Sequence, residues 1–182
     1  MLLAACGDKG AATAATPAAP PAGKMTADAV YAAASRASGF TVGSMMAANT
    51  VYVFFDPTCP HCAALWTNAK SLGSRLKVVW IPVGFLQRQS GPQGAAILAA
   101  ADPAAAMSEN EASVLDHRGG ITVPPSLPDA VLDKVKANTD LFQKTGEESV
   151  PLIVFKNGRT GQFGTHAGAV SAEELAAMAG LT

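Results

Sequence analysis

Hydrophobic and polar positions change their period along the chain, and each change predicts a different element. Runs of β-branched and aromatic residues predict strands at 50–55 and 77–83. Apolar residues at helical spacing predict helices at 27–38, where Thr26 provides the N-cap, and at 59–72. This succession of strand, helix and strand predicts an α/β fold.

A block of helices is predicted after the second strand. Residues 93–101 and 104–115 have helical composition and are separated by Asp102-Pro103. Glycine and proline pairs at 119–120 and 124–125 then predict a loop. A further helix is expected to be capped by residues 126–129, and its apolar positions follow a helical period through Phe142. The block at about 93–144 is therefore expected to be a helical insertion.

The last part of the chain predicts a hairpin followed by a helix. Pro151 opens a strand at 151–155, a position that tolerates proline. The Asn157-Gly158 pair predicts a tight turn, with a return strand at 160–163. Ser171 and Glu174 form a capping box that opens a helix at 174–179.

Composition limits the classes of function. A chain of 182 residues has the length of one domain, and no apolar run reaches the ~18 residues of a membrane-spanning helix. The net charge of −1 without a basic cluster gives no indication of nucleic-acid binding. The charged fraction of 15% is below the ~25% of typical domains, in part because of an Ala/Pro-rich N-terminal segment.

The strongest chemical signal is the motif Cys59-Pro60-His61-Cys62, which follows directly on the first strand. A thiolate is the reactive form of cysteine, and the N–H groups at a helix start stabilise it on Cys59. His61 adds positive charge or a hydrogen bond, and Pro60 suits the first helical turn. Cys62 lies within disulfide reach and is expected to be the buried, resolving thiol. The motif therefore predicts thiol–disulfide exchange through a redox-active disulfide, without a cofactor.

Other interpretations of the cysteine pair are a zinc site, a structural disulfide and copper binding, which remain open, and haem attachment, which fails. A zinc site needs about four ligands, and His117 and His166 lack suitable spacing to supply them. Haem attachment requires histidine directly after the second cysteine, where Ala63 stands. A purely structural disulfide, or Cu(I) binding by Cys59, Cys62 and His61 in a metallochaperone, are further alternatives. We assign no metal to the site.

The order of elements resembles the thioredoxin fold, and several segments resemble the DsbC/DsbG group of periplasmic disulfide proteins, DsbG above all. These segments are Phe55–Cys62, Pro82–Leu86, Ser90–Ala99 and Asp102–Ala106. The resemblance covers about 50–181. It implies that Pro151 is a cis proline beside the nucleophilic Cys59, and that Val150 and Pro151 bind substrate. It also implies cysteine-containing exported proteins as substrates and a membrane partner that recycles the site.

Two features depart from that group. The Pro60-His61 dipeptide and Val150 are similar to DsbA, whereas DsbC and DsbG usually have threonine before the cis proline. Because a stabilised thiolate stabilises the reduced form, we expect an oxidising disulfide. The alternative is a reductase that protects single cysteines from over-oxidation.

The N-terminal segment predicts export. Leu3-Ala4-Ala5-Cys6-Gly7 resembles a lipobox, which would place a lipid anchor on Cys6, although only 1–5 precede it where an h-region needs about 7–15 apolar residues. The small residues and prolines that follow predict a tether, so residues 1–24 are expected to precede a thioredoxin-like domain at 25–182. The interval before the first core strand is too short for the group's dimerisation domain. We therefore expect a periplasmic, lipid-anchored monomer.

The remaining candidates receive structural interpretations. Asp56 is predicted to be a turn residue that caps the helix start, with proton transfer as the alternative. Trp66 and Trp80 are expected in the core. Met45 and its neighbour Met46 are interpreted as filler rather than as a soft-metal site.

Overall fold

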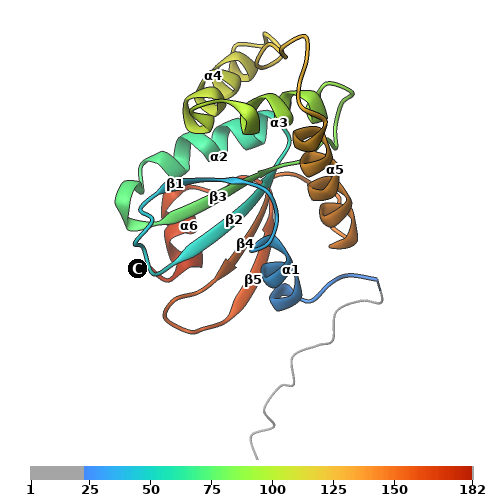
Figure 1. Ribbon diagram of the computed structural model, residues 1–182. Helices are drawn as coiled ribbons and strands as arrows, with labels where there is room; N and C mark the ends of the chain where they lie inside the picture. Colours follow the sequence, from blue (N-terminus) through green and yellow to red (C-terminus); the bar gives the residue numbers. More distant parts are fainter. Residues whose placement is uncertain (1–22, 182) are drawn as a thin grey trace, which may run out of the picture.

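The structure is a computed structural model that describes residues 23–181, and its centre is a five-stranded mixed sheet (Figure 1). The strands lie in the order β1-β3-β2-β4-β5 across the sheet. Their bounds are β1 Phe40–Gly43, β2 Thr50–Phe55, β3 Lys77–Pro82, β4 Leu152–Lys156 and β5 Phe163–Ala167. Six α-helices and the short 3-10 helix η1, Gly73–Arg75, complete the described part of the chain. The predicted α/β class is confirmed.

Strand β2 lies at the middle of the sheet and is followed by the cysteine motif. It pairs in parallel with β3, from Thr50 opposite Lys77 to Phe55 opposite Pro82. On its other side it pairs antiparallel with β4, where Phe54 lies opposite Leu152. A central strand has both faces covered, and this explains the continuous apolar run of β2.

One face of the sheet is covered by α2, Pro60–Lys70, and α6, Ala172–Ala179. The Phe55 ring lies 5.9 Å from the Trp80 ring of β3, and Trp80 lies 5.0 Å from Trp66 of α2, both edge to face. Phe40 of β1 joins this cluster through Phe55 and Trp66. Aromatic pairs in this geometry add to the burial energy, and they hold α2 against the sheet.

The opposite face is covered by α1, Ala27–Ala34, and α5, Asp129–Lys144. Side chains of β2 alternate between the two faces, so Tyr52 and Phe54 point away from Phe55. Tyr52 packs on Tyr31 of α1 at 5.1 Å, and Phe54 packs on Phe142 of α5 at 6.1 Å. The sheet is therefore enclosed between two helical layers (Figure 1).

Helices α3, Ser90–Ala99, α4, Pro103–Leu115, and α5 lie between β3 and β4 in the sequence. Asp102 caps α4 by accepting the Ala105 N–H at 3.0 Å, and Pro103 occupies the first helical turn. Helix α4 packs against α2 and α3, whereas α3 also packs against α5. The helix that carries the cysteines is thus covered by α4.

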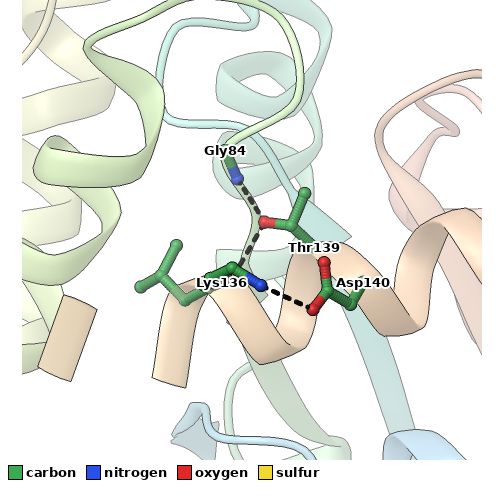
Figure 2. A network of polar contacts seen from close by, with 5 residues as sticks. Gly84, Lys136, Thr139 and Asp140 are labelled. Atoms are coloured by element: carbon green, nitrogen blue, oxygen red, sulfur yellow. Dashed lines mark hydrogen bonds and ion pairs between the residues drawn. The ribbon is translucent and has the colours of Figure 1, made fainter. Parts of the chain in front are cut away.

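Helix α5 holds the segment that follows β3, as Figure 2 shows. The Gly84 N–H donates to Thr139 Oγ1 at 2.9 Å, and the Thr139 hydroxyl donates to the Val135 carbonyl at 2.8 Å. One residue further along the helix, exposed Lys136 and Asp140 form an ion pair at 3.1 Å. The Gly84 backbone also passes so close to Gly91 that a Cβ would lie 2.9 Å from its Cα. Only glycine therefore fits at this crossing.

The hairpin after β4 differs from the prediction. The sequence predicts a two-residue Asn157-Gly158 turn and a strand at 160–163, but β5 spans Phe163–Ala167. Asn157 Oδ1 accepts the N–H groups of Arg159 and Thr160, at 3.0 and 3.1 Å. The asparagine side chain therefore organises a longer loop over 157–162, and the return strand begins later.

Other element boundaries also shift. Strand β1 was not predicted, and α1 ends at Ala34 rather than near residue 38. Helix α5 begins at Asp129 after an N-cap at Pro128 that makes no side-chain cap, so residue 126 does not cap it. The capping box of Ser171 and Glu174 is present, with α6 beginning earlier than predicted, at Ala172.

Between residues 23 and 181, no helix has the length and apolar character needed to cross a membrane.

Candidate active site around Cys59 and Cys62

A buried turn at the end of β2 places the cysteine pair, and Asp56 organises this turn. Asp56 is fully buried, and its Oδ1 accepts the Thr58 N–H at 2.9 Å and the Thr58 hydroxyl at 2.7 Å. The Ser90 hydroxyl of α3 also donates to Oδ1 at 2.7 Å. The Asp56 carbonyl accepts the Cys59 N–H at 3.0 Å, so the turn leads directly to the first cysteine.

The second oxygen of Asp56 binds the loop after β3. Its Oδ2 accepts the N–H groups of Phe85 and Leu86, each at 2.8 Å. With five donors on two oxygens, this carboxyl group satisfies the rule that buried polar groups are hydrogen-bonded. The geometry supports the predicted turn role, but the side chain does not cap α2, whose N-cap is Cys59 without a side-chain cap.

Cys59 lies at the N-terminus of α2 in an environment that stabilises its thiolate. A hydrogen bond from the Cys62 thiol is the main cause that lowers the pKa of Cys59 to about 6, against the opposing effect of burial. Backbone N–H groups of Cys62 and His61 lower this pKa further, and the charge of His61 contributes least. The predicted helix-end and His61 effects are present, but the partner thiol, which the sequence did not indicate, contributes more than either.

Cys62 has the opposite character. It is fully buried in the first turn of α2, and its N–H donates to the Cys59 carbonyl at 3.0 Å. Burial raises the pKa of Cys62 well above its ordinary value, and the negative charges of Cys59 and Glu111 raise it further. Both cysteines are free thiols in the structure. One thiol therefore ionises readily at neutral pH, whereas the other keeps its proton.

The remaining residues of the motif and the proline segment surround Cys59. Pro60 occupies the first position of α2, and both Pro60 and His61 are exposed. The peptide bond between Val150 and Pro151 is cis, the conformation that the resemblance implied. The Cys59 thiol lies 3.6 Å from the Val150 carbonyl, within the range of a hydrogen bond from sulfur. The structure thus brings the two separate sequence segments together at one sulfur.

Two functional candidates, Asn110 and Glu111 of α4, were missed in the sequence. Both are buried, and Glu111 is only 1% exposed. Asn110 Nδ2 donates to the Pro57 carbonyl at 2.8 Å, which fastens α4 to the active-site turn. With Met107 and Val114 they occupy one helix face at spacing i, i+3, i+4 and i+7, so two polar residues at core positions were the available signal.

A groove opens beside the cysteine motif. It has an empty volume of about 510 Å³, including its open mouth. The groove is lined by Thr58, Pro60, Gln87, Gln89, Val114, His117 and Gly119. His117 is exposed and adopts a left-handed backbone conformation, with φ of 58°. Leu86 and Leu115, adjacent in sequence to lining residues, are large exposed apolar side chains.

The other sequence candidates lie away from the thiols or outside the described residues. Trp66 and Trp80 are buried, as predicted. His166 is exposed on β5, and Met45 and Met46 are exposed rather than packed as core filler. Cys6 and all but the last two residues of the predicted N-terminal segment 1–24 fall in residues 1–22, which the structure does not describe. Within residues 23–181 there is no group of three or more His, Cys, Asp or Glu residues that could hold a metal ion.

Comparison with known proteins identifies relatives with a similar sequence. The thiol:disulfide interchange protein DsbG of Pseudomonas aeruginosa is 29% identical over 142 residues, covering 76% of this chain and 54% of the relative. DsbG of Escherichia coli is 31% identical over 110 residues, covering 58% of this chain and 42% of the relative. The chain therefore spans about half the length of the curated relatives it matches. The resemblance to DsbG is confirmed.

Solved structures share the fold. A periplasmic thioredoxin-like protein from Salmonella enterica serovar Typhimurium superposes with a TM-score of 0.65 at 18% identity, covering 86% of this chain and 97% of the other. The catalytic domain of Proteus mirabilis ScsC gives 0.63 at 19% identity, covering 84% and 93%. The family model of the thioredoxin-like domain matches residues 46–180. Since this match spans most of the chain, the protein belongs to the thioredoxin-like domain family, and its fold is the predicted thioredoxin-like fold.

Proposed function

We propose that this protein is a thiol:disulfide oxidoreductase that exchanges disulfides with cysteine-containing exported proteins through Cys59 and Cys62. The observation that carries the proposal is the opposite perturbation of two thiols in one C-x-x-C motif. The pKa of Cys59 is lowered to about 6, whereas the pKa of Cys62 is raised. A thiol that is ionised at neutral pH is both a good nucleophile and a good leaving group.

The reaction in the oxidising direction has two exchanges. A substrate thiolate attacks Sγ of Cys59 in the Cys59–Cys62 disulfide, and Cys62 leaves with the electron pair and takes up a proton. A second substrate thiolate then attacks the substrate sulfur of the mixed disulfide, and Cys59 leaves as a thiolate. Two electrons pass from the two substrate thiols to the enzyme disulfide. The low pKa of Cys59 favours its departure in the second exchange.

The substrate is proposed to bind as an extended segment beside Val150 and Pro151. The Val150 carbonyl faces the Cys59 sulfur at 3.6 Å, so backbone contacts there would hold a substrate cysteine at the reactive atom. The groove beside Pro60 has both polar and apolar lining residues and lies near exposed Leu86. Such a mixed surface suits flexible protein segments rather than one rigid partner.

The preferred direction is oxidising, because every interaction that stabilises the Cys59 thiolate also stabilises the reduced protein. The second candidate is a reductase that protects single cysteines from over-oxidation, since the relatives' name, thiol:disulfide interchange protein, fits either direction of exchange. The redox potential separates the two. A value near about −120 mV is typical of strong oxidants, and a value near about −270 mV is typical of thioredoxin-type reductants.

The proposed location is the periplasm, where the protein would be anchored by lipid on Cys6 and recycled by a membrane redox partner. The name of the Salmonella neighbour, a periplasmic thioredoxin-like protein, supports the compartment. Labelling of cells with a radioactive fatty acid tests the anchor. Label that is present in the wild type and lost in Cys6→Ser supports it, and equal labelling contradicts it.

The function is tested by equilibrating the full chain with a glutathione redox buffer. Cys6→Ser serves as the background, so that only Cys59 and Cys62 report. In this background we expect one disulfide per chain to form and break, and Cys59→Ser should abolish exchange. Exchange that survives Cys59→Ser contradicts the proposal. Copper bound to the same sample without exchange activity would favour the Cu(I)-binding alternative instead.

A further inference from the structure

Glu111 is a buried carboxyl group that the exchange reaction described above does not use. Its side chain is 1% exposed, and within residues 23–181 its Oε2 atom is one of three buried side-chain atoms without a hydrogen-bond partner. Its other oxygen, Oε1, accepts a single long bond of 3.3 Å from Asn110 Nδ2. A buried acid with an unpartnered oxygen lowers the stability of the folded protein, which suggests that Glu111 has a function.

The position of Glu111 is fixed relative to the thiols. Its neighbour Asn110 donates to the Pro57 carbonyl at 2.8 Å, two residues before Cys59. Asn110 Oδ1 also accepts the Ile121 N–H at 2.8 Å, so this amide joins the loop after α4 to the active-site turn. Helix α4 packs along α2, which carries both cysteines. Glu111 is therefore held on a rigid element beside the reactive pair.

The charges that act on Glu111 are those of Cys59 and Asp56, both acidic, whereas the cation of α2 that reaches α4, Lys70, is bound to the Ser108 hydroxyl at 3.1 Å. Burial is the main cause that raises the pKa of Glu111 to about 8, and the negative charges of Cys59 and Asp56 raise it further. In return, Glu111 is one of the charges that raise the pKa of Cys62. His61 of the cysteine motif is exposed, and its charge acts on Cys59. Glu111 is thus electrostatically coupled to both thiols, and its proton affinity depends on the charge of Cys59.

We propose that Glu111 carries the proton of Cys62 during disulfide exchange, directly or through one water molecule. The proposal rests on the function proposed above and adds a residue to it. Asp56 is the other carboxyl group close to the thiols, but its oxygens already hold five donors. Among these two acids, only Glu111 has an oxygen that is free to exchange a proton.

Both directions of the reaction balance with this role. When the Cys59–Cys62 disulfide is opened, protonated Glu111 gives its proton to the leaving Cys62 sulfur and becomes a carboxylate. When a mixed disulfide on Cys59 is resolved, the Glu111 carboxylate takes the proton of Cys62. The Cys62 thiolate then attacks Sγ of Cys59 and releases the substrate as a thiolate.

The charge of Cys59 sets the timing. Burial is the main cause that raises the pKa of Glu111, and in the reduced protein the Cys59 thiolate raises it further and so helps to hold the proton on that carboxyl group. In the mixed disulfide Cys59 is uncharged, and this contribution disappears. Glu111 therefore becomes a carboxylate more readily at the stage when Cys62 must lose its proton.

The test compares Glu111→Gln with the unchanged protein in the Cys6→Ser background. Reduced protein is mixed with oxidised glutathione, quenched with acid at set times, and analysed by mass spectrometry across pH 5–9. This separates formation of the mixed disulfide from its resolution by Cys62. We expect the resolution step to slow by at least about tenfold near pH 7 in Glu111→Gln. The rate should recover with rising pH as hydroxide replaces the carboxylate.

Glu109→Gln is the matched control, because Glu109 is exposed on the same helix and the side chain undergoes the same chemical change. Both steps should keep their rates and pH profiles in this variant. An unchanged pH profile of resolution in Glu111→Gln overturns the proton-transfer role while leaving the proposed function intact. Loss of all exchange in the unchanged protein overturns both.

A second measurement covers the case in which Glu111→Gln does not fold. Infrared difference spectra of the wild-type chain, recorded between the reduced and disulfide forms with carbon-13-labelled glutamate, report carboxyl protonation. We expect the band of a buried protonated carboxyl group to change between the two forms. A spectrum without such a change contradicts the proposal.

Discussion

Two buried carboxyl groups lie near the thiol pair, and they differ in how their oxygens are used. Asp56 accepts five hydrogen bonds from the turn, the loop after β3 and α3. Glu111 accepts one long bond, and its Oε2 has no partner. Asp56 joins three segments into one scaffold, whereas Glu111 keeps an oxygen available. The number of hydrogen bonds that each carboxyl group accepts thus separates the acid that holds the scaffold together from the acid proposed to transfer protons.

The largest effect is expected from Asp56→Asn. The amide would direct an N–H₂ group at donors from Thr58, Phe85 or Leu86, and would leave several buried groups without partners. We expect a loss of about 3–5 kcal/mol in the free energy of unfolding, measured by urea denaturation. Asp133→Asn, an exposed substitution on α5, should change it by less than about 0.5 kcal/mol. Similar losses for the two variants would contradict the scaffold role.

Glu111→Gln should raise the free energy of unfolding, in contrast to Asp56→Asn, and the size of this gain should depend on pH. The pKa of Glu111 in the reduced folded protein is about 8, against an ordinary value of 4.5. The folded state therefore binds the proton more tightly, and its stability falls as pH rises from 4.5 to 8. Glutamine removes this loss. The stability gain of Glu111→Gln should be absent at pH 4 and reach a few kcal/mol above pH 8, at about 1.4 kcal/mol per pKa unit. Denaturation of the reduced proteins at several pH values measures it, and a gain independent of pH would be the contrary result.

The origin of the low pKa of Cys59 can be tested with two further variants. The hydrogen bond from Cys62 is the largest cause, and the charge of His61 is the smallest. Cys62→Ala should therefore raise the pKa of Cys59 more than His61→Ala does. Thiolate absorbance at 240 nm as a function of pH measures both shifts in the Cys6→Ser background. The reverse order would assign the stabilisation mainly to the histidine.

The smallest effects are expected where α5 holds Gly84, the residue before the loop that Asp56 binds. Thr139→Val removes the acceptor of the Gly84 N–H and should cost about 1–2 kcal/mol. Asp140→Asn breaks the neighbouring exposed ion pair with Lys136 and should cost less than about 0.5 kcal/mol. Thermal denaturation in low and high salt compares them, and only the Asp140 variant should lose its effect in salt. Equal losses of stability in Thr139→Val and Asp140→Asn would mean that burial does not make the first contact stronger than the second.

Strong apolar patterns predicted the fold well. Strand β2 lies at the predicted residues, and β3 is one residue shorter than predicted, because their β-branched and aromatic runs are long and continuous. Strand β1 was missed because it has four residues next to Gly39 and ends at Gly43, so its pairing with β3 defines it more than its composition. Strand β5 was misplaced because a side chain, Asn157, sets the length of the preceding loop. Local sequence describes long buried elements better than short edge strands.

The active site likewise has a part that could be predicted from the sequence and a part that could not. The cysteine motif could be recognised from its local sequence, whereas the cis conformation of Pro151 followed from the resemblance to the thioredoxin family. The partners that tune them come from distant elements. Neither the bonds between Asp56 and the loop at 85–86 nor the placement of Glu111 has a signature near the cysteines. Only the helical spacing of Glu111 with apolar residues such as Met107 and Val114 indicated burial, and that spacing does not say what the residue faces.

The aromatic cluster beneath α2 has an optical consequence. The chain has two tryptophans, and their rings lie 5.0 Å apart in this cluster. Trp66 lies four residues after Cys62 on the same helix, so the two side chains are neighbours on its surface. All tryptophan emission therefore originates beside the redox pair. Because sulfur in a disulfide quenches nearby indoles more strongly than a thiol does, the protein's fluorescence should report its own oxidation state.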